Sequence, residues 1–552
     1  MSHLTPGSTD TGSRLLPASM FMALGTVLSR LTGFLRAALL LAAIGKSLDA
    51  DIFTQANTIP NSLYILVAGG IFNVVLVPQL VRSMRNDADG GQAYASRVLT
   101  LGLIVLGVAT LALVVCVPLV ARLAFDNEFF GADLNAQRES AYTLMRYCMP
   151  QVFFYGAFVL VGQMLNARER FGPMMWAPIL NNVIACSVLV AYIALYGRSD
   201  EADGFSAEQE LLLGVGSSVG VLAQALVLVP YVRAAGIRLR PRFDFRGVGL
   251  GHTLRLAVWT FGFVILNQVA FFAISRVAVG SSITAAQDGG EASGATVYQS
   301  AFLIIQVPHA IITVSLVTAT MPLLSRLAAD GDLPRVRAEI LHTLRLVLTA
   351  VVPFGVLLAC LGQPVAAALF GYGDADTTVI GETITAFAPG LVLFTLHYLL
   401  LRGFYALEDT RTPFFVQIGL ATTNIGAAIG FTTGAPPEHV AALLALAYGL
   451  AYLVGVLSSG TLLSRRVGSI LDRSMLLFLL QLALAAGCAA GCTLGLVWVL
   501  EDYGAPAESA GPALVMTAIA GTGGVFTYVL VARLTRLPEL HLLTAAVTRR
   551  AR

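Results

Sequence analysis

The side chains with the clearest chemical potential are charged groups placed inside hydrophobic segments near the start of the chain. Arg30 and Arg36 lie in the first such segment, and Asp51 opens the second. Charges at the depth of a lipid bilayer are unfavourable, so they usually face a water-filled cavity or a partner. Guanidinium groups bind anionic oxygens through charge-assisted hydrogen bonds. The two arginines therefore predict a cavity that accepts an anionic substrate.

The spacing of the two arginines fixes how they can share a cavity. Six residues of helix correspond to a net rotation of about 240° and a rise of about 9 Å. Arg30 and Arg36 therefore sit at different heights and on partly different faces, and both could border one wide cavity. The alternative is that Arg30 snorkels to the membrane interface and that Arg36 pairs with Asp51.

Amide and imidazole side chains in other hydrophobic segments are further candidates for the cavity lining. They are Asn57 and Asn61 in the first half of the chain, and Gln306 and His309 in the second half. For each amide the alternative is a hydrogen bond between two helices. For His309 the alternative is a packing or hydrogen-bonding role.

The composition requires that these residues be positioned by membrane helices. Of 552 residues, 57% are hydrophobic and 12% are charged, and the mean hydropathy is +0.78. Ordinary soluble domains are about 25% charged. We therefore predict an all-α polytopic membrane protein with about fourteen transmembrane helices, because runs of spanning length fall at 17–43, 51–81, 98–121, 141–165, 174–196, 211–232, 254–279, 296–322, 340–361, 378–401, 414–432, 438–463, 475–500 and 512–534.

The loops between these runs alternate in charge. Loops after the even-numbered helices carry arginines, such as Arg82 and Arg168, whereas the opposite loops are acidic, as at Asp200 and Asp374. Positive loops stay on the cytoplasmic side. Both termini are therefore predicted to be cytoplasmic, and the regular alternation supports the count of fourteen.

An internal repeat predicts two lobes. The loop sequences after helices 4 and 10 both contain Ala-x-Glu and end in proline, and helices 2 and 8 both end in Pro-x-x-x-Arg. Because the repeat contains an even number of helices, its halves are related by a pseudo-two-fold axis along the membrane normal. The predicted parts are a cytoplasmic N-terminal tail, an N-lobe of helices 1–6, a cytoplasmic linker, a C-lobe of helices 7–12, two extra helices and a C-terminal tail, at 1–16, 17–234, 235–252, 253–463, 464–534 and 535–552.

Sequence patterns of other chemistries are missing. The sequence has no Walker loop, no HExxH, and no arrangement of residues for nucleophilic catalysis. The six cysteines fall in apolar runs without zinc-type spacing. We therefore expect a transporter rather than an enzyme, with no catalytic residue, no metal site, no cofactor and no nucleic-acid partner. The driving force would then be a substrate gradient, an ion gradient or the membrane potential.

Several segments resemble the MurJ/MviN family of lipid II flippases, of the multidrug/oligosaccharidyl-lipid/polysaccharide exporter superfamily. They are Ser29-Arg30-Leu31-Thr32-Gly33-Phe34-Leu35-Arg36, Asp51 with Pro60-Asn61, Leu165-Asn166-Ala167 with Arg170-Phe171, and Gly403-Phe404-Tyr405-Ala406 with Asp409-Thr410-Arg411-Thr412-Pro413. The similarity extends from helix 1 to helix 14, and the pattern is similar to an actinobacterial branch.

The resemblance implies movement of lipid II, an undecaprenyl-linked disaccharide-peptide, from the inner to the outer leaflet of the bacterial cytoplasmic membrane by alternating access. It assigns cavity roles to Arg30, Arg36 and Asp51, and a lipid-tail groove to the last two helices. Membrane lipids and cell-wall synthesis or division proteins are the implied partners. The alternatives are a polysaccharide-repeat flippase or a drug/ion antiporter of the same fold, and a non-transporting scaffold of the cell-wall machinery.

The sequence departs from the family pattern at four positions. Tyr64 and Leu303 stand where better-known members carry cationic residues on helices 2 and 8. Gly69 stands where the family has an acidic residue. Ala37, which follows Arg36, also stands in place of an acidic residue. The predicted cavity is therefore less charged than the family pattern. Either Gln306 and His309 replace part of that charge, or the substrate contacts differ.

Overall fold

The computed structural model describes residues 10–66, 83, 89, 91–168, 170–198, 204–236, 240–244, 250–288, 292–372, 376–502 and 509–540. For residues 10–23 and 250–257 it describes the backbone alone. Throughout these ranges the regular elements are helices, and thirteen helical stretches are long and apolar enough to cross a membrane. The predicted second span, 51–81, is described only as far as residue 66. The chain is a multi-pass α-helical membrane protein, as its composition predicts.

The helices group into two compact units. Unit 1 consists of Met1–Ile44, Ile52–Leu123 and Phe129–Val264, and unit 2 of Gly45–Asp51, Ala124–Glu128 and Ile265–Arg552. Unit 2 thus includes two short segments from the first half of the sequence. The predicted lobe boundaries and the pseudo-two-fold axis stay predictions.

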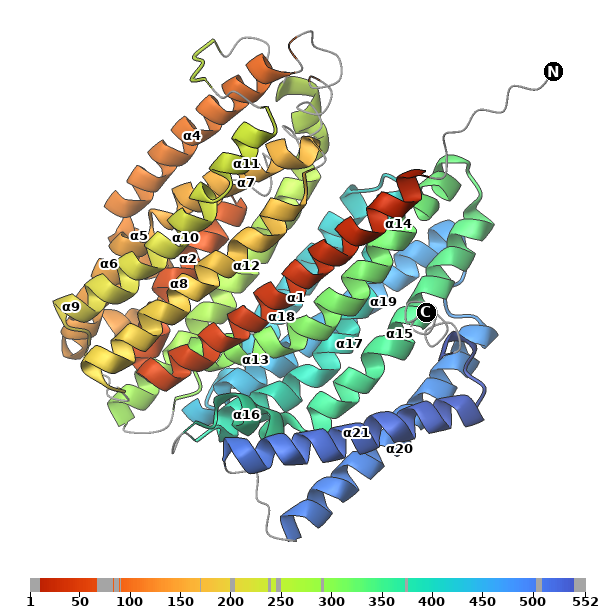
Figure 1. Cartoon of the computed structure of the whole chain (residues 1–552). Helices are drawn as coiled ribbons and strands as arrows, with labels where there is room; N and C mark the ends of the chain where they lie inside the picture. The colour runs from red at the N-terminus through yellow and green to blue at the C-terminus, as the bar shows by residue number, and fades with distance from the viewer. Residues whose placement is uncertain are drawn as a thin grey trace. The chain divides into compact units, whose positions relative to one another are not determined.

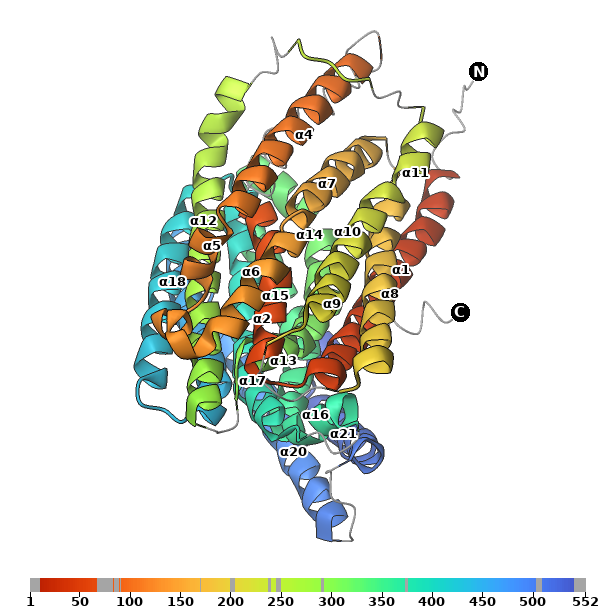
Figure 2. The same ribbon diagram turned by 90° about the vertical axis from the view of Figure 1, so that its left-hand side faces the viewer.

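Unit 1 is a helical bundle in which α1 packs along α8 (Figures 1 and 2). Its helices, some of which end in unit 2, are α1 (Asp10–Ile44), α2 (Leu48–Tyr64), α4 (Gln92–Val115), α5 (Val117–Ala124), α6 (Asn135–Cys148), α7 (Gln151–Ala167), α8 (Gly172–Tyr196), α9 (Ala207–Glu210), α10 (Gly216–Leu226) and α11 (Val229–Ala234), with 3-10 turns η3 (Asn127–Phe130) and η4 (Ala132–Leu134) and a π segment η5 (Leu211–Val215).

The core of unit 1 joins α4, α7, α8 and α11. Leu106, Leu160 and Leu228 are among its buried side chains. Gly102 and Gly156 let α4 and α7 approach closely, because a Cβ on Gly156 would lie 2.3 Å from Leu106 Cδ1. This packing holds the scaffold against which α1 and α2 are positioned.

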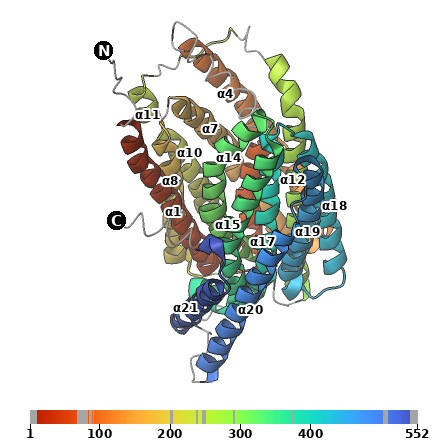
Figure 3. The ribbon, with the colours of Figure 1, turned by 90° about the vertical axis from the view of Figure 1, so that its right-hand side faces the viewer.

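Unit 2 contains α12 from Ile265 onward and all helices that follow. Within this unit α17 packs against α15 and α19, and α20 packs against α21 (Figure 3). The helices are α12 (Leu250–Asp288), α13 (Ala295–Pro308), α14 (Val314–Ala329), α15 (Leu333–Cys360), α16 (Gly362–Phe370), α17 (Thr378–Ala406), α18 (Arg411–Thr432), α19 (Val440–Val467), α20 (Arg473–Asp502) and α21 (Ala510–Leu534), with a π segment η6 (His309–Thr313) and a 3-10 turn η7 (Pro437–His439).

Pro60 and Pro308 both fall within continuous helical stretches. Pro60 lies inside α2. Pro308 ends α13, and the chain continues through the π segment η6 into α14. Proline lacks the N–H that an α-helix uses, so a local change of hydrogen-bond register is its expected consequence. π segments are frequent at functional sites.

Candidate functional site

The face of α1 that carries Arg36 packs on α8. Asn182 of α8 donates to the Ser29 carbonyl oxygen at 3.0 Å and to Thr32 Oγ1 at 3.1 Å. Arg36 follows Thr32 by four residues and Ser29 by seven, so it lies on the same face of the helix. Gly25 helps this approach, since a Cβ there would lie 2.8 Å from the Trp176 indole nitrogen.

The charge of Arg36 is directed into the interior of unit 1. Arg36 interacts electrostatically with Cys148 of α6, Tyr155 of α7 and Cys186 of α8. The guanidinium is half-buried, and these neighbours are thiols and a phenol rather than carboxylates. Arg36 therefore places its positive charge near thiols and a phenol of α6, α7 and α8.

Arg30 is also half-buried, but on another part of the α1 surface. The described part of unit 1 contains no ion pair between a carboxylate and either Arg30 or Arg36. Arginine is effectively always protonated. The two side chains are therefore available to an anionic ligand.

The two asparagines of α2 are both half-buried. Asn57 Oδ1 accepts a hydrogen bond from Gln151 Nε2 at 3.0 Å, which is the interhelical bond considered as its alternative role. Tyr64, which stands at a family cationic position, packs against Tyr155 with 5.8 Å between ring centroids. The surroundings of Arg36 thus gain aromatic surface where a second cation was expected.

Asp51 belongs to unit 2, where it caps the N-terminus of α13. Its Oδ2 accepts from Ser282 Oγ and from the Ala295 N–H, each at 2.8 Å, and its Oδ1 accepts from the Thr296 N–H at 2.7 Å. The side chain is fully buried. Helix N-termini leave N–H groups unsatisfied and favour negative charge. The partners of Asp51 are thus a hydroxyl and two backbone amides of its own unit.

Gly294 makes this cap sterically possible. A Cβ at Gly294 would lie 1.9 Å from Asp51 Oδ2 and 2.1 Å from Ser282 Oγ. The sequence did not reveal this relation, because Asp51 and Gly294 are separated by more than 240 residues and no local pattern joins them.

His309 is buried at the start of the π segment η6. Its Nδ1 lies 3.1 Å from Thr395 Oγ1, and its ring contacts Phe394 and Tyr398 of α17, with centroids 4.3 and 4.9 Å apart. These contacts support the packing and hydrogen-bonding alternative. Gln306, one turn earlier, is half-buried.

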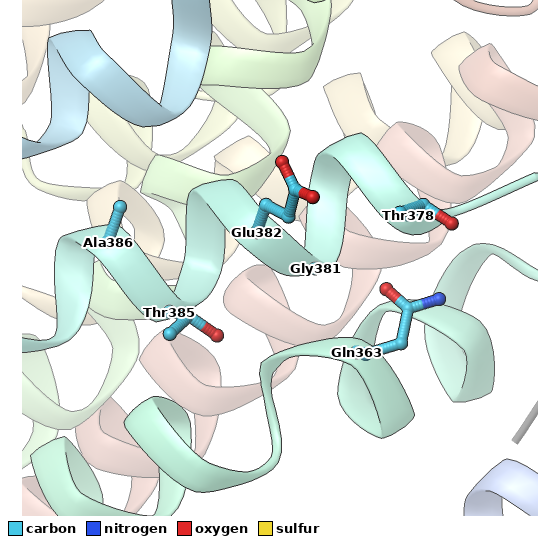
Figure 4. A pocket seen from close by; sticks show the side chains of 6 residues that line it. All are labelled: Gln363, Thr378, Gly381, Glu382, Thr385 and Ala386. Carbon is cyan, nitrogen blue, oxygen red and sulfur yellow. The ribbon is translucent and has the colours of Figure 1, made fainter. Parts of the chain in front are cut away.

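Two cavities lined by described residues of unit 2 are not suited to an anion. The first, of about 430 Å³, lies between α16 and the first turns of α17, and Glu382 contributes a carboxylate to it (Figure 4). The second, of about 200 Å³, is lined by amides and tyrosines, including Asn267 and Gln417, which hydrogen-bond to each other at 3.2 Å. These two linings therefore offer no positive charge to an anionic substrate.

Solved structures show which class of fold these units form. A lipid II flippase MurJ in an inward closed conformation matches with a TM-score of 0.69 and 18% identity, covering 93% of this chain and 98% of that one. An inward-facing multidrug resistance MATE family transporter matches with a TM-score of 0.59 and 16% identity, covering 79% and 95%. The fold is that of the membrane transporters of the MOP superfamily.

Sequence comparison narrows this class to one family. The family model described as lipid II flippase MurJ matches residues 40–509. The chain belongs to this MurJ family. A lipid II flippase MurJ of Burkholderia cenocepacia is 29% identical over 414 residues, covering 72% of this chain and 74% of that one. A "probable lipid II flippase MurJ" of Thermotoga maritima is 26% identical over 529 residues, covering 95% and 97%.

Proposed function

We propose that this chain moves lipid II from the inner to the outer leaflet of the bacterial cytoplasmic membrane. One observation of the site carries the proposal: Arg30 and Arg36 lie in a membrane-spanning helix of a MurJ-family chain, with no carboxylate paired to either in the described part of unit 1. A pyrophosphate presents several anionic oxygens. The planar guanidinium fork suits such a group through bidentate hydrogen bonds.

The proposed cycle is alternating access between two lobes. The pyrophosphate-sugar headgroup enters from the cytoplasmic side and binds Arg30 and Arg36, while Asn61 and Gln306 contribute to the polar lining. Asn57 and His309 keep the interhelical contacts described above. The lobes then rock and release the headgroup outside. An outward-moving anion is assisted by an inside-negative potential, which is worth about 2.3 kcal/mol per charge per 100 mV. On this proposal the chain is a transporter that needs no cofactor.

Asp51 has a positioning role in the proposed cycle. Unit 2 includes the segments Gly45–Asp51 and Ala124–Glu128, which bury Leu48 and Phe125 and also make polar contacts within the unit. Besides the α13 cap, they include Lys46 with Asp376 at 3.5 Å and Arg276 with Asp126 at 2.9 Å. Polar contacts can break and reform more readily than a packed apolar core. We infer that they close the outer side of the cavity and release when it opens there.

The last two helices would carry the lipid tail. Leu480, Leu484 and Trp498 of α20 are exposed, as are Leu514 and Phe526 of α21. The two helices pack closely at Gly524, where a Cβ would lie 2.2 Å from Thr493 Oγ1. An apolar surface on a rigid helix pair fits an acyl-like chain that stays in the membrane throughout transport.

The experiment is complementation of a bacterium depleted of its own lipid II flippase. The chain should restore growth and prevent accumulation of lipid II in the inner leaflet. A polysaccharide-repeat flippase or an antiporter would not restore growth, and an antiporter would export cationic dyes. A scaffold would keep its function when Arg30 and Arg36 are changed to glutamine. Cell-wall synthesis or division proteins would then be its partners.

A further inference from the structure

Arg402 is an arginine of unit 2 whose guanidinium lies next to two tyrosine rings. Arg402 lies on α17, one turn before the helix ends at Ala406. Its guanidinium carbon lies 4.3 Å from the centroid of the Tyr398 ring and 5.6 Å from that of Tyr405. Both distances fall within the range of cation–π interactions. Two tyrosines thus hold the guanidinium on aromatic faces.

One donor of Arg402 has no acceptor among the described residues of its own unit. Its Nε is buried and has no hydrogen-bond partner within the described residues. Asp409 follows seven residues later, but that carboxylate accepts from Thr412 and pairs with Arg466 at 3.3 Å. A buried N–H without an acceptor is unfavourable, and a ligand oxygen that accepts from it would remove this cost.

Other arginines of unit 2 show what a structural role looks like. Arg337 pairs with Asp472 at 2.6 Å, and Arg345 lies 3.8 Å from the buried Glu539 while also contacting Ser474. Arg345 also lies over an aromatic ring, that of Phe478, at 5.7 Å. The Nε atoms of Arg345 and Arg402 are both buried without a hydrogen-bond partner among the described residues. Arg345 has a carboxylate nearby, whereas the described residues form no ion pair with Arg402.

Snorkelling to the interface does not account for the position of Arg402. A snorkelling side chain near this end of α17 would extend toward Ala406 and beyond. The closer ring contact is instead with Tyr398, four residues toward the helix middle. Helical side chains lean toward the N-terminus. The Tyr398 ring in turn meets His309 edge-on, with centroids 4.9 Å apart, so the stack Arg402–Tyr398–His309 leads into the interior of unit 2.

We propose that Arg402 is a substrate-contacting residue of unit 2 that binds a phosphate oxygen of an anionic lipid-linked headgroup. The inference rests on the proposed function. The contacts with Tyr398 and Tyr405 hold the guanidinium in place, and on this proposal its N–H groups bind the ligand. A planar group held in this way can bind two oxygens at once. Arg402 thereby supplies from α17 a positive charge of the kind that Leu303 does not provide on α13.

The test compares binding by the purified full-length chain and its variants. Two probes are titrated separately: a short-chain lipid II analogue and phosphatidylglycerol, each followed by native mass spectrometry. Arg402→Gln should weaken binding of the analogue about tenfold or more. Arg402→Lys should be intermediate, because it keeps the charge without the fork. Tyr398→Leu should weaken binding between about twofold and thirtyfold, whereas Tyr398→Phe keeps the ring.

Controls separate the inference from folding and from the proposed function. Arg465→Gln removes an exposed arginine near the end of α19 and should bind like the unchanged chain. The thermal stability of each variant shows whether it is folded. If Arg402→Gln does not fold, Arg402→Lys takes its place in the binding measurement. If the unchanged chain neither binds the analogue nor supports growth, the proposed function fails. If it does both and Arg402→Gln and Arg402→Lys bind both probes normally, this inference alone is wrong.

The two probes also distinguish the source of the phosphate. Loss of analogue binding with unchanged phosphatidylglycerol binding assigns the site to the transported substrate. Loss for both probes supports a phosphate site that bulk anionic lipid can also occupy. Loss for phosphatidylglycerol alone overturns the assignment to the substrate.

Discussion

Arg36 and Asp51 are both charged groups in apolar sequence, yet their surroundings differ in kind. Asp51 is fully buried and accepts three hydrogen bonds, two of them from the N-terminus of α13. Arg36 has thiols and a phenol as its electrostatic neighbours. A satisfied charge serves structure, whereas an unsatisfied one is available for a ligand. Substitution of Arg36 is therefore expected to impair transport, whereas substitution of Asp51 is expected to reduce stability.

Changing Arg36 should abolish transport without unfolding the chain. Arg36→Gln keeps a polar side chain but removes the charge that binds pyrophosphate, so cells depleted of their own flippase should not grow. Arg36→Lys should restore growth partly, because an ammonium group lacks the guanidinium fork. The measurement is growth at matched protein level. Arg198→Gln, at an exposed position, should behave like the unchanged chain, and growth of the Arg36→Gln cells would contradict the assignment.

Changing Gly294 should disturb the cap rather than the cavity. In Gly294→Ala the new methyl group overlaps Asp51 Oδ2 and Ser282 Oγ, and overpacking of this kind costs about 1–3 kcal/mol. Asp51→Ala should cost a similar amount, because it leaves the Ser282 hydroxyl and the Ala295 and Thr296 N–H groups without their acceptor. Thermal unfolding of the purified chain measures both. Gly419→Ala is the matched control, since nothing lies within 4 Å of a Cβ there.

For individual residues, the sequence indicates which charged side chains are unusual in a membrane helix, but it does not indicate which residues they contact. The paired arginines stand out because charges are rare in membrane helices. The cap of α13 by Asp51 depends on a contact between distant segments, which no spacing rule reveals. Arg402 escaped prediction because an arginine near the end of a span looks like a snorkelling residue; its difference lies in the ring contacts with Tyr398 and Tyr405.

Among the elements, the turn between α17 and α18 is fixed by Asp409. Its carboxylate accepts from the Thr412 N–H at 2.9 Å and from Thr412 Oγ1 at 2.7 Å. Partial burial by itself would raise the pKa of Asp409, but these bonds and the charge of Arg466 outweigh it and hold the pKa below its usual 3.8. The carboxylate is therefore ionised at neutral pH and stabilises the start of α18.

The turn should make stability sensitive to acid. A carboxyl group whose pKa is lower in the folded state stabilises the fold fully above its unfolded pKa, and this contribution is lost as the pH falls through the folded value. The melting temperature should thus decrease below about pH 4, and Asp409→Asn should reduce that decrease. Melting curves between pH 3 and pH 7 test this. An identical acid dependence in the variant would contradict the role given to Asp409.

The helices themselves were largely predictable, and their irregularities were not. The predicted run 378–401 corresponds to α17 and 414–432 to α18. The π segment η6 after Pro308 and the short helix α16 were not expected. Hydrophobicity determines where the chain can cross a bilayer, but it carries no information on hydrogen-bond register or on short helices packed against α17 and α21.

For the whole molecule, the charge alternation of the loops predicts the topology. Single cysteines placed in a cysteine-free version report it through an impermeant maleimide applied to intact cells. Asp376→Cys should be labelled, because the proposed orientation places the acidic loops outside. Arg335→Cys should be protected until the membrane is permeabilised, because the same orientation places the arginine-rich loops in the cytoplasm. Labelling of Arg335→Cys in intact cells would invert the proposed orientation and the direction of transport derived from it.

The location of lipid II tests the central claim most directly, namely that the arginines of α1 carry its headgroup across the membrane. Cells depleted of their own flippase receive either this chain or the double variant Arg30→Gln and Arg36→Gln at equal protein level. An impermeant enzyme that cleaves the lipid II headgroup is then added outside, and the released product is measured. We predict abundant product with the unchanged chain and almost none with the double variant. Equal amounts of product from both would contradict the account.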